Sequence, residues 1–245
     1  PKRTFAEFAA QFYKKQPLHL SAVTGTNGKT SVAWFTQSLW EKLGHRAASF
    51  GTLGATPKSV TSENIALTTP DTVTLHKALR DAVERNFQHL VIEASSHGLE
   101  QHRLDGLSIT SAAFTNLSRD HIDYHGTMSA YLEAKKRLFS DLLPSSGTAV
   151  LNADIPEFRA LLDVCNNAFS YGFSGKELKL LNQRPTTAGQ ELELEIFGNR
   201  ETLSIPLIGS VQAMNIICSL GLAVAEGADV SATTSQLTSL SGVPG

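Results

Sequence analysis

Apolar residues follow two kinds of spacing along most of this chain. Short apolar runs, each predicted to form a buried strand, lie at 18–23, 90–92, 109–114 and 148–151. Between such runs, apolar residues recur with helical spacing, as at Val32, Phe35, Leu39 and Leu43. Strands that alternate with helices predict an α/β fold, in which helices flank a mostly parallel sheet.

Three further helices follow from the same spacing. A short helix is expected over 5–14 and a last helix over roughly 211–226. Thr69 is expected to cap a third helix, with Pro70 at its first helical position.

Residues 176–206 have a different pattern. Leucines and an isoleucine alternate with polar residues in two runs. The two runs are separated by residues 187–190. Period-two alternation predicts a hairpin. We therefore expect a small antiparallel subsheet beside the parallel one.

Composition narrows the class of protein. The chain has 245 residues, enough for a full core, with 41% hydrophobic and 18% charged residues. A net charge of −2 gives no basic field for nucleic acid or an anionic membrane. No apolar run approaches membrane-spanning length, the first residues do not resemble a signal peptide, and Cys165 and Cys218 stand alone. We expect a cytoplasmic protein without nucleic-acid or membrane partners.

Residues 22–31 form a glycine-rich turn between the first strand and its helix. Gly25 and Gly28 allow backbone N–H groups to point into one concavity at the helix N-terminus. Lys29 can then reach outer phosphates, and the Thr30 hydroxyl can ligate Mg²⁺. Ala22 stands where the common P-loop pattern has glycine, so an ordinary strand-to-helix turn is the alternative. The turn nevertheless predicts a nucleoside triphosphate site.

Glu93 directly follows the apolar run at 90–92. A carboxylate at the carboxyl end of a parallel strand can share a Mg²⁺ with Thr30, whereas the alternative role is to cap the next turn. The polar residues at 95–103 are typical of a binding loop, but chemistry alone assigns no role to His97 or His102 within it.

A third polar cluster lies at 116–125. His121 and His125 are four residues apart with aspartates among them, which makes a zinc site conceivable, but the sequence offers no clear further ligand. A role toward Mg²⁺ or phosphate fits the neighbouring phosphate loop better. The remaining alternative is a solvated polar loop.

Lys135 falls in the middle of an apolar helical arc formed by Met128, Tyr131, Leu132, Leu138 and Phe139. A lysine there must snorkel, pair with an acid or lose its charge. A neutral amine can react with CO₂ to form a carbamate, which would add an anionic metal ligand. Snorkelling is the alternative.

Taken together, these motifs resemble the Mur ligases of peptidoglycan synthesis, and among them the branch that adds the third residue of the stem peptide. The matching runs lie at 23–31, 67–71, 93–103, 114–128 and 134–139. The resemblance implies a P-loop-type central domain that binds ATP and Mg²⁺. The implied substrate is UDP-N-acetylmuramoyl-L-alanyl-D-glutamate, whose carboxylate would attack the γ-phosphate of ATP to give an acyl phosphate. An incoming amine, most commonly of meso-diaminopimelate and otherwise of L-lysine, would then displace the phosphate.

The resemblance also implies roles for matched positions. Residues expected to contact ATP are Gly25, Thr26, Asn27, Gly28, Lys29, Thr30, Ser31, Asn116, Gln212 and Asn215. Those expected to bind the UDP-linked dipeptide are Thr68, Thr69, Ser95, Gln101 and Arg103. Thr30 and Glu93 would hold one Mg²⁺, and His121 with carbamylated Lys135 a second. Catalysis would depend on Lys29, Glu93, His121 and Lys135. Gln212 stands where the family usually carries asparagine, which puts its adenine contact in doubt.

The resemblance divides the chain into three parts. Residues 1–17 are expected as a linker or helix after a missing N-terminal domain, 18–235 as the ATP-binding domain, and 236–245 as a linker to a missing C-terminal domain. Because the C-terminal domain would hold the incoming amino acid, we expect no ligation by this chain alone. A folylpolyglutamate synthase-like ligase and a nucleotide-binding module without chemistry are the alternatives.

Overall fold

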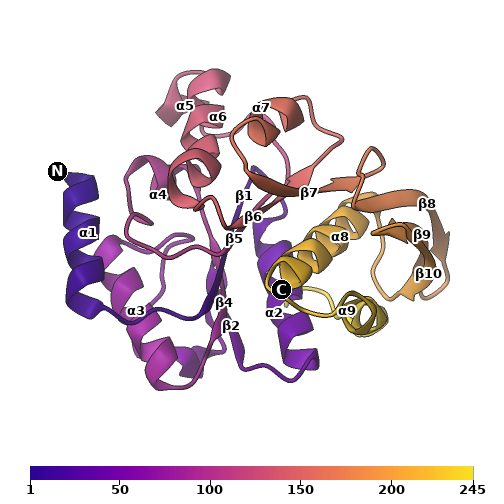
Figure 1. Ribbon diagram of the computed structural model, residues 1–245, viewed down its shortest axis with the longest axis horizontal. Coiled ribbons are helices and arrows are strands. Elements are labelled where there is room, and N and C mark those ends of the chain that lie inside the picture. Colours follow the sequence, from indigo (N-terminus) through magenta and orange to yellow (C-terminus); the bar gives the residue numbers. More distant parts are fainter. Residues whose placement is uncertain (245) are drawn as a thin grey trace.

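A computed structural model describes residues 1–244, so Gly245, the last residue of the expected 236–245 linker, lies outside the described residues. The fold is built on one ten-stranded sheet in the order β10-β9-β8-β7-β6-β5-β1-β4-β2-β3 (Figure 1). Its strands are β1 (His19–Thr24), β2 (Ala47–Gly51), β3 (Gly54–Thr56), β4 (His89–Glu93), β5 (Ser111–Phe114), β6 (Thr148–Asn152), β7 (Asn167–Gly172), β8 (Leu178–Thr186), β9 (Gly189–Ile196) and β10 (Asn199–Ile205). Along the sheet, the neighbouring strands β8, β7, β6, β5, β1, β4 and β2 are parallel, which confirms the expected α/β class.

Helices cover both faces of the parallel strands. They are α1 (Lys2–Tyr13), α2 (Lys29–Lys42), α3 (Thr72–Glu84), α4 (Ser96–Glu100), α5 (Ile122–His125), α6 (Met128–Arg137), α7 (Phe158–Leu162), α8 (Ser210–Ala225) and α9 (Val230–Gln236). Short 3₁₀ turns lie at Lys58–Val60 and Leu237–Ser239, and a π-helical turn at Leu138–Leu142 extends α6. Within residues 1–244, no helix combines the length and the apolar character that crossing a membrane requires.

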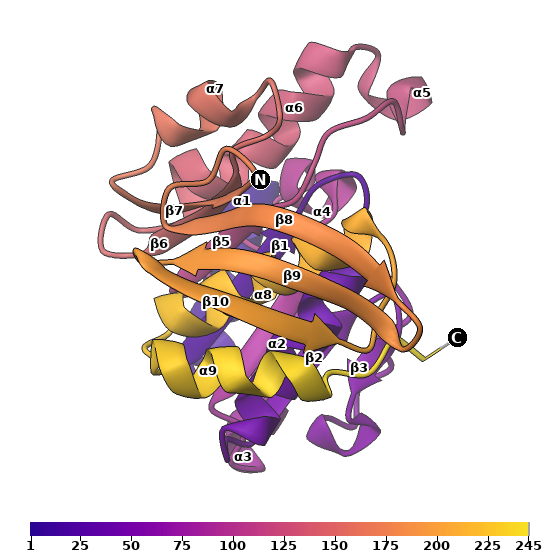
Figure 2. The same ribbon diagram turned by 90° about the vertical axis from the view of Figure 1, so that its right-hand side faces the viewer.

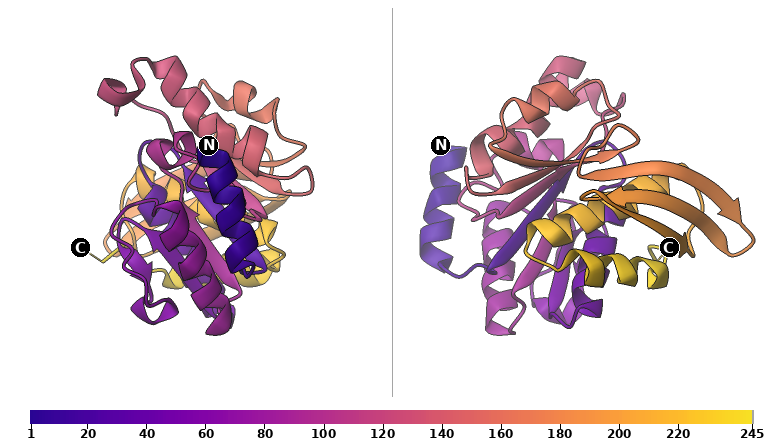
Figure 3. Two further views of the ribbon diagram at one scale, coloured as in Figure 1. Left: turned by 90° about the vertical axis from the view of Figure 1, so that its left-hand side faces the viewer. Right: turned by 45° about the vertical axis from the view of Figure 1, so that its right-hand side comes forward.

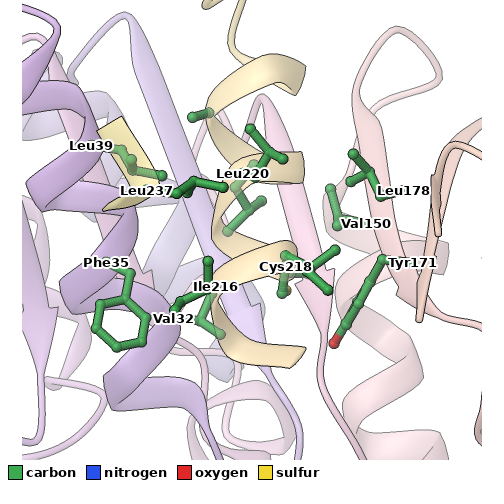
Figure 4. Close-up of a cluster of buried hydrophobic side chains, with 14 of the residues drawn as sticks. Val32, Phe35, Leu39, Val150, Tyr171, Leu178, Ile216, Cys218, Leu220 and Leu237 are labelled. Atoms are coloured by element: carbon green, nitrogen blue, oxygen red, sulfur yellow. The ribbon is translucent and has the colours of Figure 1, made fainter. Parts of the chain in front are cut away.

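Each face of the sheet has its own core. On one face, Phe35 and Leu39 of α2 pack near Ile216 and Leu220 of α8, over side chains of the strands (Figure 4). On the other face, α3 and α4 cover apolar side chains of β1, β4 and β5. Both faces of β1 are therefore buried, as expected for a parallel strand between helical layers.

The expected antiparallel subsheet is present as β8, β9 and β10, and it continues the main sheet. β8 runs parallel to β7, pairing Tyr171 with Leu178, before the chain turns into the antiparallel strands. Their buried leucines face the core that contains α8. The three strands extend away from the parallel part, with α9 beside them (Figures 2 and 3).

The expected cap of the third helix is wrong by two residues. Asp71 is the N-cap of α3, because its carboxylate accepts the backbone N–H groups of Val73 and Thr74, both at 3.1 Å. The hydroxyl of Thr69 instead donates to the carbonyl oxygen of Glu93 at 2.7 Å. The Thr69 hydroxyl is therefore bonded to the end of β4 and not to the helix.

The segments on either side of 18–235 pack on the rest of the fold. Helix α1 lies beside α3 with Ala6 and Ala9 buried (Figure 3). Leu237 and Leu240, inside the stretch expected as a linker, are buried in the core that contains α8.

Candidate nucleotide-binding site

The candidate residues gather at the carboxyl ends of adjacent parallel strands. Val23 of β1 lies in register with Glu93 of β4, and Thr24 with Phe114 of β5. The glycine-rich turn, Glu93 and the loop after β5 therefore meet at one edge of the sheet. This is where open α/β sheets bind ligands.

Two glycines shape the turn between β1 and α2. Gly28 has a φ of +87° and is the N-cap of α2, and a Cβ there would lie 2.5 Å from Oδ1 of Asn215. Gly25 has a φ of +139°, and a Cβ there would overlap the hydroxyl of Thr115. Neither position can carry a side chain without displacing a neighbour. The backbone thus follows the path that opens the N-terminus of α2 toward an anion.

Asn116, at the end of β5, holds this turn from the opposite side. Its side-chain oxygen accepts the N–H of Asn27 at 3.0 Å, and its side-chain nitrogen donates to the carbonyl oxygen of Asn27, also at 3.0 Å. The N–H of Thr26 donates to the backbone oxygen of Asn116 at 2.8 Å. These bonds fix the phosphate loop to β5.

The amine of Lys29 lies against its own loop. It donates to the carbonyl oxygens of Gly25 at 3.0 Å and Thr26 at 2.8 Å. Burial lowers the pKa of Lys29, and the nearby carboxylates of Glu93 and Asp120 partly oppose this shift. The structure therefore brings a partly desolvated cation to the loop that is expected to hold phosphates.

Lys135 of α6 reaches the same loop. Its side chain is buried, with the residue 1% exposed, so it does not snorkel. The amine donates to the carbonyl oxygen of Gly25 at 2.7 Å and lies 4.5 Å from the centre of the Tyr131 ring. Burial, reinforced by the charge of Lys29, lowers the pKa of Lys135 to about 7. A substantial neutral fraction at neutral pH makes this amine a nucleophile.

Glu93 is a buried carboxylate surrounded by oxygen and amide groups. It is 2% exposed, and it accepts the Thr30 hydroxyl at 3.0 Å and the Thr52 N–H at 2.8 Å. Burial raises the pKa of Glu93, whereas these bonds and the charge of Lys29 act in the opposite direction. A carboxylate beside a hydroxyl is a ligand pair suited to a hard cation such as Mg²⁺. The Thr30–Glu93 pair therefore fits a magnesium ion.

His121 lies in the loop after β5, beside Tyr131. His121 is exposed, has a φ of +51°, and its ring lies 6.3 Å, centre to centre, from that of Tyr131. Tyr131 therefore lies near both His121 and Lys135. Across residues 1–244, no group of three or more histidine, cysteine, aspartate or glutamate side chains could hold a metal ion. The zinc interpretation of the loop at 116–125 has no support in this geometry.

The residues expected to bind the UDP-linked dipeptide form one connected network. Thr69 contacts Ser95 at 2.9 Å between hydroxyl oxygens, and Arg103 donates to the carbonyl oxygen of Thr69 at 2.7 Å. Arg103 also donates to the side-chain oxygen of Gln101 at 2.7 Å. Thr68 joins the network to Thr52, a contact of 3.2 Å between hydroxyl oxygens. The set thus lies beside Glu93, where the Thr69 hydroxyl donates to the Glu93 carbonyl oxygen.

A cavity of about 160 Å³ opens next to the phosphate loop. It is lined by Thr115, Asn116, Asn152, Tyr171, Ser210, Val211, Met214 and Asn215. Gln212 does not line it, and the side-chain oxygen of Gln212 is buried without a hydrogen-bond partner. Asn215 is therefore brought to the site, but Gln212 is not.

Several residues of the site were not singled out from the sequence. Thr52 holds Glu93, Tyr131 joins Lys135 to Thr26 through a 3.2 Å contact between oxygens, and Asn152 and Tyr171 line the cavity. A signal was available for Asn152 alone, because it lies at the carboxyl end of β6, a strand that the apolar pattern predicts. Tyr131 carried no such signal and read as a core residue.

Comparisons with known proteins agree on one family. The family model described as Mur ligase middle domain matches residues 23–223. A UDP-N-acetylmuramoyl-L-alanyl-D-glutamate–2,6-diaminopimelate ligase of Caulobacter vibrioides is 43% identical over all of this chain and 52% of its own length. The ligase of the same name from Zymomonas mobilis is 42% identical over all of this chain and 51% of its own length.

A solved structure agrees with these relatives. A structure described as UDP-N-acetylmuramoyl-L-alanyl-D-glutamate–2,6-diaminopimelate ligase superimposes with a TM-score of 0.87 and 32% identity, over all of this chain and 51% of that one. The chain thus spans about half the length of the curated relatives it matches.

Proposed function

The chain belongs to the Mur ligase family, and from this membership we propose that it is the ATP-binding middle domain of a ligase that builds a peptidoglycan precursor. The observation that carries the proposal is the convergence of Lys29 and Lys135 on the Gly25 carbonyl, beside the Thr30–Glu93 pair. Two amines and a cation site around one glycine-rich loop suit a triphosphate. The adjoining cavity between Asn116 and Asn215 suits the nucleoside.

Each group of the site has a role in this proposal. The N–H groups of the loop at 25–31 and the amine of Lys29 bind the phosphates of ATP. Thr30 and Glu93 would hold Mg²⁺, which neutralises phosphate charge when it is bound. The substrate carboxylate attacks the γ-phosphate, ADP leaves, and an acyl phosphate results. An amine then displaces the phosphate to form the amide. Most of the rate enhancement would come from positioning and from neutralised charge.

We further propose that Lys135 functions as a carbamate. Its neutral amine would attack CO₂, forming an N–C bond and releasing one proton to solvent. The resulting anion would be, with His121, a ligand for a second Mg²⁺. The burial of Lys135 and its low pKa support this assignment. The adjacency of both residues to Tyr131 supports their joint role.

The proposed substrates are UDP-N-acetylmuramoyl-L-alanyl-D-glutamate and meso-diaminopimelate, and the reaction is assigned to the cytoplasm. The names of the relatives support diaminopimelate over L-lysine. The network of Thr68, Thr69, Ser95, Gln101 and Arg103 would bind the UDP-linked dipeptide. The domain expected over 18–235 would supply the ATP site, with the flanking segments packed on it.

Calorimetry on this chain tests the nucleotide assignment. A non-hydrolysable ATP analogue with Mg²⁺ should bind, and Glu93→Gln should weaken binding only when Mg²⁺ is present. Equal binding with and without the metal, or no binding at all, would overturn the assignment.

Phosphate release separates the candidate ligases. A ligase of full family length that carries this domain should release phosphate with the UDP-linked dipeptide and diaminopimelate. Release with a folate instead would identify a folylpolyglutamate synthase-like enzyme. Nucleotide binding without release on any substrate would leave a binding module.

A further inference from the structure

Five aromatic rings cluster beside Lys135, and His97 connects the elements that carry them. The cluster consists of His97, His121, Tyr124, His125 and Tyr131. The centre of the His97 ring lies 4.0 Å from that of Tyr124, 4.9 Å from His121 and 5.5 Å from His125. His97 thus contacts three rings of the segment at 119–126.

That segment has little else to hold it. Helix α5 contains no buried residue, and His121 before it adopts a left-handed backbone conformation. Gln101 donates to the Tyr124 hydroxyl at 3.1 Å. The side chain of His121 has a 3.4 Å contact with Asp120, which belongs to the same segment. Contacts between aromatic rings must therefore supply much of what holds the segment at 119–126 to the rest of the protein.

His97 itself has a rigid support. It lies on α4, whose N-cap Ser95 accepts the N–H of Gly98 at 3.1 Å. A Cβ at Gly98 would lie 2.5 Å from the Thr69 side chain, so α4 packs directly against the network beside Glu93. Leu99 is fully buried, and α4 contacts α6, the helix of Lys135. A ring on α4 is therefore fixed relative to Lys135.

We infer that His97 is a positioning residue, whose ring anchors the segment at 119–126 to α4 and thereby holds His121 beside Tyr131 and Lys135. The ring meets His121 edge to face, at an interplanar angle of 87°, which restricts the rotation of the His121 imidazole. Groups that orient a metal ligand typically change metal affinity 10- to 100-fold when they are removed. The part of this inference that concerns metal rests on the proposed function, whereas the anchoring does not.

Two variants separate the ring from its nitrogens. His97→Phe keeps an aromatic ring and His97→Ala removes it. Phe173→Ala, which removes an exposed ring outside the aromatic cluster, is the control. Hydrogen exchange of residues 119–126 should accelerate at least tenfold in His97→Ala and stay near wild type in His97→Phe. Unchanged exchange in His97→Ala would overturn the inference, whatever the chain binds.

Mn²⁺ binding in the presence of a non-hydrolysable ATP analogue, followed by electron paramagnetic resonance, tests the consequence for His121. The affinity should fall about 10- to 100-fold in His97→Ala and stay within about threefold in His97→Phe. Equal losses in both variants would mean that a nitrogen of His97 is itself required, which contradicts a positioning role. Absence of Mn²⁺ binding in the wild type would refute the proposed function and leave the exchange experiment to decide the anchoring.

Discussion

The side-chain amines of Lys29 and Lys135 donate to the same carbonyl oxygen, that of Gly25, at 3.0 and 2.7 Å. One amine comes from the start of α2 and the other from α6, so two lysines from separate helices meet at one carbonyl oxygen. Burial disfavours a charge on the second amine, and repulsion between two ammonium groups this close adds to that cost. This explains why Lys135, the more buried of the two, has the pKa that falls to about 7.

Lys135→Ala should lower the ligation rate of a full-length enzyme carrying this domain on the order of 100- to 1,000-fold, because a proposed ligand of the second Mg²⁺, which would neutralise charge in the transition state, is lost. Lys136→Ala, one residue along the same helix with a more exposed side chain, is the matched control. Steady-state phosphate release measures both variants. Activity of Lys135→Ala within tenfold of wild type would refute the assignment. Rescue of that variant by acetate or formate would support the carbamate.

Lys29→Ala should also lower the ligation rate on the order of 100- to 1,000-fold, because the charge of the phosphates is then no longer neutralised by this amine. Lys42→Ala, in the last turn of the same helix, should leave the rate unchanged because Lys42 is exposed at the far end of α2. Small carboxylates should not rescue Lys29→Ala, since its proposed role requires a cation. A rescue of this variant equal to that of Lys135→Ala would contradict the two separate roles.

Gly28→Ala should abolish measurable binding of an ATP analogue, because the added Cβ would press on Asn215 and distort the loop. Gly227→Ala provides a control for backbone strain, since Gly227 has a nearly equal φ of +91° but no atom within 4 Å of the added Cβ. Both variants should lose stability to strain, and only Gly28→Ala should lose affinity. Calorimetry and thermal unfolding measure the two effects. Equal affinity in the two glycine variants would show that the contact with Asn215 is unimportant.

Acid should destabilise the fold through His89, at the edge of the sheet opposite the site. Its ring stacks between His19 and His45, with both ring centres 4.2 Å away, and the residue is 8% exposed. Burial and these two histidines lower the pKa of His89 from 6.5 to about 4. Between pH 6.5 and about 4, the folded state therefore binds fewer protons than the unfolded state. The stability present above pH 6.5 should fall by up to about 3 kcal/mol as the pH drops toward 4.

Urea unfolding of wild type and His89→Phe between pH 4 and 8 measures this effect. The variant should show a flatter dependence of unfolding free energy on pH below 6.5. Parallel curves for the two proteins would exclude His89 as the source.

The sequence was informative where one residue type has one structural use. Gly28-Lys29-Thr30 after an apolar strand predicted a turn that opens a helix, as the structure has it, whereas the apolar arc around Lys135 left snorkelling and burial open, and the structure buries the side chain. The main helices and several parallel strands were predicted as well, because apolar residues recur with a different period in helices and in strands. Strands β2 and β7 escaped notice, because small and polar residues in them hide the apolar pattern.

Other features depend on contacts between distant segments. Thr69 has the chemistry of a helix cap, but the end of β4 competes for its hydroxyl and Asp71 caps α3 instead. Thr52 and Tyr131 acquire their places only when β2 and α6 pack beside the loop. No spacing along the chain encodes such partners, so the sequence could not identify them.

The walls of the cavity beside the phosphate loop come from the ends of β5, β6 and β7 and from α8, segments that lie far apart along the chain. Such a pocket exists only after these distant pieces have come together, a late event in folding. A nucleotide bound there would raise the melting temperature of the entire domain, because it selects the assembled state. Conversely, a substitution that loosens β6 or β7 would weaken nucleotide affinity without touching a phosphate. Affinity at this pocket would therefore report how completely the sheet has assembled.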